Sequence, residues 1–185
     1  MSNDLFDLMK MRRKALMSVF RELDAPEVCE MDGEFRATLL DQGAWLHNFI
    51  TIVAFNMPGV WISKSFYPIN ETNGRGYNSF RVGANIKKTY HMRTYVGPSR
   101  LDGRPSYHLD YSTVNKSNVP SFTNLAGEIR KYDDALYLGI GTADFGFSRL
   151  RREQPFVLEG SLAKFDAWDF GRREFIRGQR TAVSI

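Results

Sequence analysis

The feature that most constrains this chain is a series of short segments rich in aromatic and β-branched residues. Six follow one another between residues 60 and 145, from VWISKSFYPI to ALYLGIGTADF, and QPFVLEGSL at 154–162 adds another. Turn-forming stretches such as NETNGRG, PSRLDGR and NKSNVPS separate them. Short strands joined by turns are typical of an antiparallel meander. The sequence therefore predicts a mainly β fold, an antiparallel closed or half-closed barrel over residues 58–160.

Segments of different periodicity flank these strands. Residues 1–24 have apolar residues at three- and four-residue spacing, which predicts an amphipathic N-terminal helix. Residues 43–56 are apolar on all sides and suit a short buried helix. Residues 29–40 fit either a strand or a helix, and the segment from residue 162 onward fits a C-terminal helix or strand. We expect one domain spanning residues 1–185.

Composition indicates the compartment and the kinds of partner to expect for this chain. The chain has one cysteine, so it cannot form an internal disulfide framework, and its amphipathic start lacks the pattern of a signal peptide. The longest apolar stretch, FITIVAF, is too short to cross a bilayer. We therefore expect a soluble, cytoplasmic protein with no membrane partner. The net charge is +4, but the basic clusters have acidic neighbours, which favours solvated faces over nucleic-acid binding.

Alternation along the predicted strands divides their side chains between two faces. The apolar face comprises Tyr90, Met92, Thr94, Tyr107, Leu109, Tyr111, Leu125, Gly127 and Ile129. The polar face comprises His91, Arg93, Tyr95, His108, Asp110, Glu128 and Arg130. If Asp133 and Asp134 form a two-residue turn, Arg130 lies opposite Tyr137. Tyr137, Gly139 and Gly141 then join the polar face, and Leu136, Leu138 and Ile140 join the apolar face.

Two orientations of the barrel follow, and the pattern leaves both open. In one, the apolar face forms the core and the charged residues are exposed, as in most antiparallel sheets. In the other, the barrel encloses the polar face, and helices cover the apolar outside. Gly139 and Gly141 would then leave room for a ligand.

The second orientation predicts acid–base chemistry that needs no cofactor. Its catalytic residues would be Asp110, Glu128, His108 and Arg130. Asp110 or Glu128 would act as the general base, and His108 or His91 would transfer a proton. Arg130 and Tyr137 would stabilise an oxyanion. The predicted ligand-binding residues are His91, Arg93, Tyr95, Tyr137 and Trp61. We predict no metal site, because paired-histidine motifs are absent from the sequence.

Two short motifs resemble those of a known family. Gly59-Val60-Trp61, which opens the first clear strand, resembles the G-x-W signature of lipocalin-like (calycin) barrels, and Asp110-Tyr111 is similar to their second signature. GVWISK also resembles the bacterial GXWXG-type small proteins, with Ser63 in place of the second glycine. The resemblance implies a closed barrel around a hydrophobic small molecule. It also implies that Trp61 packs against an arginine near the end of the chain, Arg172 or Arg173.

The sequence supports three functions. The first is a cofactor-independent isomerase, cyclase or lyase that acts on a largely apolar metabolite. The second is a non-catalytic binding protein for a lipid, pigment or similar ligand, which an apolar interior containing Tyr90, Met92, Leu109 and Ile129 would favour. The third is an interaction module whose N-terminal apolar stripe forms a homodimer.

Overall fold

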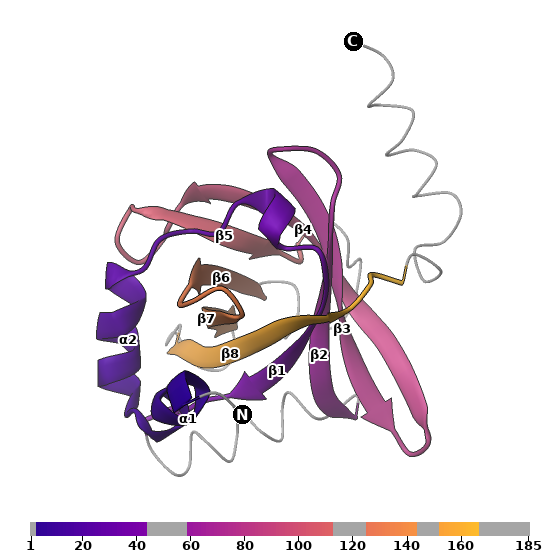
Figure 1. The fold of residues 1–185 in the computed structure, drawn as a ribbon, viewed down its shortest axis with the longest axis horizontal. Helices are drawn as coiled ribbons and strands as arrows, with labels where there is room; N and C mark the ends of the chain where they lie inside the picture. The colour runs from indigo at the N-terminus through magenta and orange to yellow at the C-terminus, as the bar shows by residue number, and fades with distance from the viewer. Residues whose placement is uncertain (1–2, 44–58, 113–124, 144–151, 167–185) are drawn as a thin grey trace.

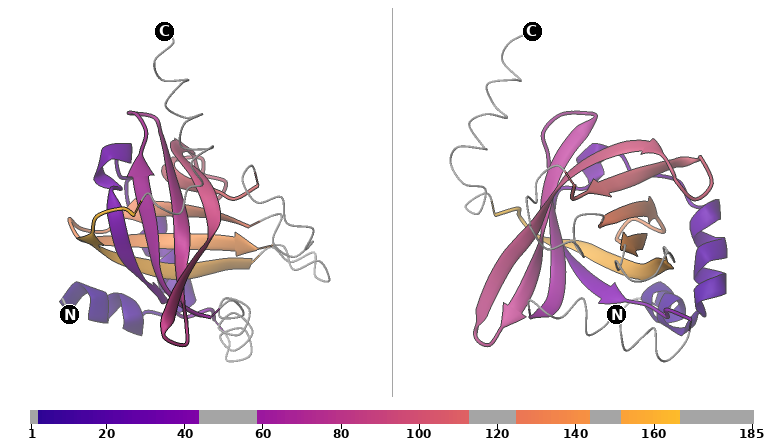
Figure 2. Two further views of the ribbon diagram at one scale, coloured as in Figure 1. Left: turned by 90° about the vertical axis from the view of Figure 1, so that its right-hand side faces the viewer. Right: turned by 180° about the vertical axis from the view of Figure 1, so that it is seen from behind.

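The computed structural model describes residues 3–43, 59–112, 125–143 and 152–166, and its centre is a closed barrel of eight antiparallel strands. The strands are β1 (Gly33–Leu39), β2 (Val60–Pro68), β3 (Asn73–Val82), β4 (Asn85–Pro98), β5 (Pro105–Asp110), β6 (Ala126–Lys131), β7 (Leu136–Ala143) and β8 (Arg152–Ala163). Each strand pairs with its neighbour in sequence, and β8 closes the barrel against β1 (Figures 1 and 2). The predicted mainly β barrel is confirmed.

The segment 29–40, which fitted either a strand or a helix, contains both. A short helix η1 (Val28–Glu30) precedes β1. Val28 and Met31 are buried among the barrel's core residues, so this segment covers one end of the barrel. The predicted helix over 43–56 and most of the C-terminal segment lie outside the described residues.

The predicted N-terminal helix is divided into two, α1 (Asn3–Lys10) and α2 (Arg13–Glu22). The division lies where Arg12 has an extended backbone. Contacts with the barrel fix this point, because the Arg13 amide donates to Asp41 Oδ2 at 3.0 Å and its guanidinium pairs with Glu153 of β8. The break therefore has a tertiary cause that the apolar periodicity does not reveal.

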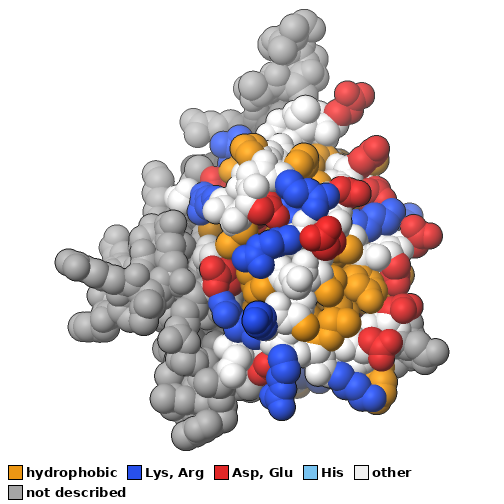
Figure 3. Space-filling view, turned by 90° about the vertical axis from the view of Figure 1, so that its left-hand side faces the viewer, with side chains coloured by type: hydrophobic (Ala, Val, Ile, Leu, Met, Phe, Trp, Pro, Cys, Tyr) orange, Lys and Arg blue, Asp and Glu red, His pale blue; other side chains and the backbone are white. Residues whose placement is uncertain are grey.

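Both helices lie along the outside of the barrel (Figure 1). Their buried side chains form one cluster with outward-facing residues of β7 and β8: Leu5, Leu8, Leu16, Met17, Phe20, Leu136, Leu138, Ile140 and Val157. The N-terminal stripe thus covers the sheet. Acidic and basic side chains are intermixed on this side of the molecule (Figure 3).

The apolar face of β4, β5 and β6 points into the barrel. Met92, Tyr107, Leu109, Tyr111 and Ile129 belong to the interior cluster, and the partly buried Tyr90 packs against it. The polar face of these strands points outward. Of the two orientations that the sequence left open, the structure has the one with an apolar interior.

The expected register between β6 and β7 is wrong by one residue. Tyr137 pairs with Lys131, not with Arg130, and Leu138 pairs with Arg130. The loop has three residues instead of two, because Asp133 Oδ1 accepts hydrogen bonds from the amides of Ala135 and Leu136 at 2.7 and 2.8 Å. A one-residue shift reverses the faces of a strand. Tyr137, Gly139 and Gly141 therefore face the interior, whereas Leu136, Leu138 and Ile140 face the helices.

Arg130 anchors the outer layer. Its side chain is fully buried and donates to both carboxylate oxygens of Asp102 at 2.6 and 2.8 Å, and to the carbonyl of Phe20 in α2 at 2.9 Å. The guanidinium also lies 4.6 Å from the centre of the Phe20 ring. One side chain thus joins β6, the turn after β4 and the end of α2.

We expect Arg130→Met to lower the free energy of unfolding by roughly 3–5 kcal/mol, because it leaves Asp102 without its buried partner. The control is Arg36→Met, which removes an exposed pair with Glu159 and should cost less than about 1 kcal/mol. Urea unfolding of both variants measures the difference. Equal losses would show that Arg130 does not anchor the helices.

Candidate functional site

Lys64 lies inside the barrel, in the middle of β2. Its register partners are Phe35 of β1 and Asn78 of β3, and all three side chains face inward. The residue is only 3% exposed. A bulge between Trp61 and Ser63 shifts the alternation of β2, so that Trp61 also faces inward.

Two neutral oxygen atoms accept hydrogen bonds from the Lys64 amine. Nζ donates to Asn78 Oδ1 at 2.6 Å and to Tyr111 Oη at 2.7 Å. Three aromatic rings surround the same atom, with their centres 5.0 Å (Trp61), 5.4 Å (Phe156) and 5.5 Å (Tyr111) from Nζ. The amine therefore lies in an aromatic cage formed from β2, β8 and the end of β5. We call Lys64, Asn78, Tyr111, Trp61 and Phe156 the lysine cage.

Burial lowers the pKa of Lys64 from 10.5 to about 7, because desolvation disfavours the ammonium form. In the described part of the chain, no carboxylate forms an ion pair with this amine that would offset the effect. Burial also raises the pKa of Tyr111 well above its usual range. Near neutral pH, the site therefore combines a protonated phenol with an amine that is close to half charged.

The part of the interior around Phe35 and Phe156 is filled by aromatic side chains. Phe35 contacts Phe66 and Tyr137, with ring centres 5.6 and 5.5 Å apart. The space expected at Gly139 is occupied, because a Cβ there would lie 2.1 Å from the ring of Phe156. Gly139 therefore makes room for a core side chain, and the expectation of ligand space at this position is wrong.

Gly141 and Gln154 differ from this packed region. A Cβ at Gly141 would meet Gln154 only at ordinary contact distances, 3.6 Å or more. Gln154 pairs with Gly141 on the inner face, and its Oε1 is buried without a hydrogen-bond partner among the described residues. A buried acceptor of this kind requires an explanation, and a ligand donor or a water molecule would supply one.

Two of the predicted ligand-binding residues face the interior. Trp61 belongs to the lysine cage, and Tyr137 packs edge-on against Phe35. The proposed partners of Trp61, Arg172 and Arg173, lie outside the described residues. Within the described part, Lys64 supplies a cation over the indole ring.

The other predicted site residues lie on the outside of the barrel. These are His91, Arg93, Tyr95, His108, Asp110, Glu128 and Arg130. Tyr95, His108 and Glu128 form a row across β4, β5 and β6, and the Tyr95 ring stacks on His108 at 4.9 Å. Arg93 pairs in register with Asp110, and His91 contacts Tyr77 edge-on at 6.3 Å. The structure does not bring this polar set together with Trp61 and Tyr137.

Several of these outer residues have partners that hold a turn in place. Glu128 accepts hydrogen bonds from Ser99 Oγ and, at 2.9 Å, from the Arg100 amide, while His108 Nε2 lies 3.2 Å from the Gly97 carbonyl. Asp110 accepts hydrogen bonds from the Ser112 amide and hydroxyl. Together with the Arg130–Asp102 pair, these contacts stabilise the outer loops. The acid–base roles of Asp110, Glu128, His108 and Arg130 stay predictions.

Sequence reasoning missed Lys64 and Asn78. A signal was present, because Lys64 alternates with Ile62 and Phe66 in WISKSF. An ionisable residue at a strand position that alternates with apolar, core-facing residues is rare unless it has a function or a partner. Asn78 gave no such signal.

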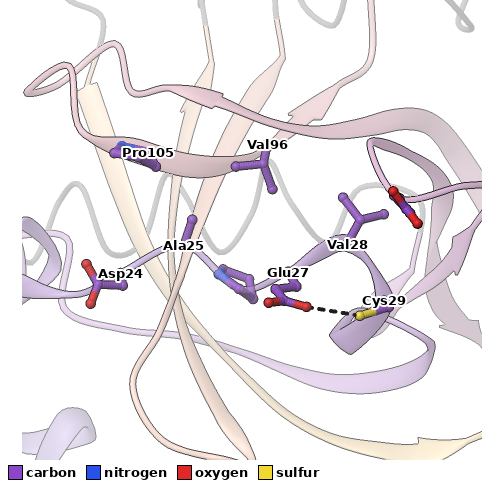
Figure 4. A pocket seen from close by; sticks show the side chains of 9 residues that line it. Asp24, Ala25, Glu27, Val28, Cys29, Val96 and Pro105 are labelled. Carbon is purple, nitrogen blue, oxygen red and sulfur yellow. Dashed lines mark hydrogen bonds between the residues drawn. The ribbon is translucent and has the colours of Figure 1, made fainter.

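A groove of about 760 Å³ lies outside the barrel, between the segment that follows α2 and the rim of β4 and β5 (Figure 4). Ala25, Val28, Val96 and Pro105 contribute apolar side chains to it. Its remaining lining residues are Asp24, Pro26, Glu27, Cys29 and Glu71. Cys29 donates to Glu27 at 3.4 Å, which raises the pKa of the thiol. This thiol is therefore a poor nucleophile.

Two further observations bear on partners. Across residues 3–43, 59–112, 125–143 and 152–166, no three His, Cys, Asp or Glu side chains lie close enough to hold a metal ion. The helices of the described chain are too short and too polar to span a membrane.

Comparison with known proteins gives a fold relationship. No family model and no curated protein matches the chain. A crystal structure of a protein from Thermomonospora curvata is similar, with a TM-score of 0.52 and 15% sequence identity. The match covers 80% of this chain and 87% of that one. At this identity, the similarity shows a shared fold and nothing about activity.

The pH dependence of stability tests the environment of Lys64. Its pKa is about 7 in the folded protein and 10.5 for an exposed lysine, so between these pH values the unfolded chain binds more protons. The free energy of unfolding should therefore rise with pH from about 7 to 10. Lys64→Met should remove most of this rise, whereas Lys88→Met, which removes a pair with Asp166, should retain it.

Urea unfolding at several pH values gives the free energy of unfolding of wild type and of each variant as a function of pH. Tyr111 is the titratable side chain in contact with Nζ, and its raised pKa keeps it out of this window. Parallel curves for wild type and Lys64→Met would show that the amine is not desolvated.

Proposed function

We propose that the barrel binds an apolar, aromatic small molecule whose acceptor group is held by the lysine cage. The observation that carries this proposal is a buried amine within a largely apolar interior. An apolar core of this size folds without an amine, and burying one costs free energy. A binding role accounts for keeping the lysine there.

The chemistry of the cage indicates the ligand class. Trp61, Tyr111 and Phe156 present ring surfaces, which suit a planar aromatic or conjugated body. Lys64 Nζ and the Tyr111 hydroxyl are donors, so the ligand should carry a carboxylate, sulfonate, phenolate or carbonyl oxygen. Gln154 Oε1 would accept a hydrogen bond from a ligand donor.

The resemblance to lipocalin-like barrels supports the same proposal. The two motifs that carry the resemblance, Gly59-Val60-Trp61 and Asp110-Tyr111, contribute Trp61 and Tyr111 to one cage around Lys64. The interior is also apolar, the condition under which the sequence favoured a non-catalytic binding protein over an enzyme. We also propose that residues 1–185 form one domain and that this domain binds the ligand by itself.

Acid–base catalysis is the second candidate, and one observation favours it. Lys64 has a pKa of about 7, which suits a general base or acid at neutral pH. An isomerase, cyclase or lyase would then use Lys64 and Tyr111. Conversion of a bound compound, lost in Lys64→Met and in Tyr111→Phe, would distinguish an enzyme from a binding protein.

Two fluorescent probes with nearly the same skeleton test the binding proposal. 1-Anilinonaphthalene-8-sulfonate carries an anionic acceptor, and N-phenyl-1-naphthylamine lacks it. Both should bind wild type with increased emission. Lys64→Met should weaken the binding of the sulfonate probe by roughly 10- to 100-fold, because the variant cannot form the charge-assisted hydrogen bond. The affinity for the neutral probe should change little.

Lys88→Met is the matched control, because Lys88 pairs with Asp166 and is absent from the interior cluster. It should leave both affinities unchanged. No binding of either probe would overturn the proposal. Binding that Lys64→Met leaves unaltered for both probes would place the ligand elsewhere than the cage.

A further inference from the structure

We infer that Lys64 is a carbonyl-binding residue, whose amine condenses reversibly with the aldehyde or ketone group of an apolar ligand inside the barrel. This inference rests on the proposed function, because the ligand must enter the interior. It goes further by naming a covalent link and the functional group that forms it.

The surroundings of Nζ favour the neutral amine. Its two hydrogen-bond partners are the uncharged Asn78 Oδ1 and Tyr111 Oη. Two other lysines have carboxylate partners: Lys88 lies 2.5 Å from Asp166, and Lys131 lies 2.5 Å from Glu30 and 3.3 Å from Asp134. A lysine without an acidic partner in a desolvated site loses its proton easily, and the neutral form is the nucleophile.

The pKa values support this contrast. Burial lowers the pKa of Lys64 to about 7, whereas hydrogen bonds to Glu30 and Asp134 raise the pKa of Lys131 to about 12. At pH 7, the fraction of free amine at Lys64 is roughly a thousandfold larger than at an ordinary lysine, whose pKa is about 10.4. One chain thus contains a reactive lysine and an unreactive one for comparison.

The neighbouring groups suit each step of the condensation. Asn78 Oδ1 accepts one amine hydrogen and so orients the nitrogen. Tyr111 Oη, 2.7 Å from Nζ, lies close enough to donate to an oxygen on the carbon that Nζ attacks. Its raised pKa keeps the phenol protonated for this role.

The reaction balances without an oxidant or a reductant. The lone pair of Nζ adds to the carbonyl carbon, and one amine proton moves to the carbonyl oxygen, which gives a carbinolamine. Loss of the second amine proton together with that hydroxyl group releases one water and leaves a carbon–nitrogen double bond. When this imine is protonated, the rings of Trp61, Tyr111 and Phe156 stabilise its charge.

The test uses trans-cinnamaldehyde, a small conjugated aldehyde, with sodium cyanoborohydride at pH 7. The hydride reduces the imine to a stable amine, so each reaction adds one cinnamyl group. Intact mass spectrometry counts the groups, and peptide mapping locates them. Among the lysine side chains, we expect Lys64 to be labelled at least about tenfold faster than Lys131.

Three variants complete the experiment. Lys64→Met and Lys64→Arg should both lose the fast labelling, because neither side chain forms an imine. The arginine variant keeps a long cationic side chain, so it serves as the test if the methionine variant does not fold. Lys131→Met is the matched control and should be labelled at the wild-type rate. Circular dichroism confirms that each variant is folded.

The outcomes separate this inference from the proposed function. If N-phenyl-1-naphthylamine binds but labelling is slow and spread over several lysines, the covalent link is wrong and the binding function stands. If the neutral probe does not bind and Lys64 is not labelled, both are wrong. If peptide mapping assigns the fastest-labelled lysine to a position other than Lys64, and its labelling persists in Lys64→Arg, the inference is also wrong.

Discussion

The register of the hairpin between β6 and β7 determines how the whole barrel is arranged. Because Lys131 pairs with Tyr137, the aromatic ring of Tyr137 and the glycines that follow face inward. Leu138, which pairs with Arg130, faces outward beneath α1 and α2. Asp133 sets this register through its hydrogen bonds to the loop amides. With the pairing that a two-residue loop would give, neither the aromatic interior nor the covered outer face could form.

The polar groups of the barrel fall into two classes with different environments. On the outside, Arg130 and Glu128 have charged or backbone partners that fix the 99–104 turn and α2. Inside, Lys64 has two neutral acceptors and three rings. The outer charges are paired at short range and stabilise structure. The inner amine has no ion-pair partner among the described residues, which is why it is the better candidate for contact with a ligand.

Lys64 and Lys131 show how environment separates two identical side chains. Lys131 lies at the end of β6, where Glu30 and Asp134 raise its pKa. Lys64 lies deep in β2, where desolvation lowers its pKa with no carboxylate among the described residues to oppose it. Each of the two lysines counts as one positive charge in the net charge of the chain. The structure gives one a structural role and makes the other the centre of the proposed binding site.

The sequence by itself determined the barrel, because short β-rich segments separated by turn residues leave few other folds. It also defined two faces on β4, β5 and β6. Alternation has no direction, however, so which face lay inside was open, and the three-residue loop at Asp133 reversed the expected faces of β7. Only the tertiary structure brought Lys64 together with Asn78 and Tyr111, which lie 14 and 47 residues away in the chain. Closure of the barrel makes these contacts, and local sequence pattern carries no information about side chains that meet across its interior.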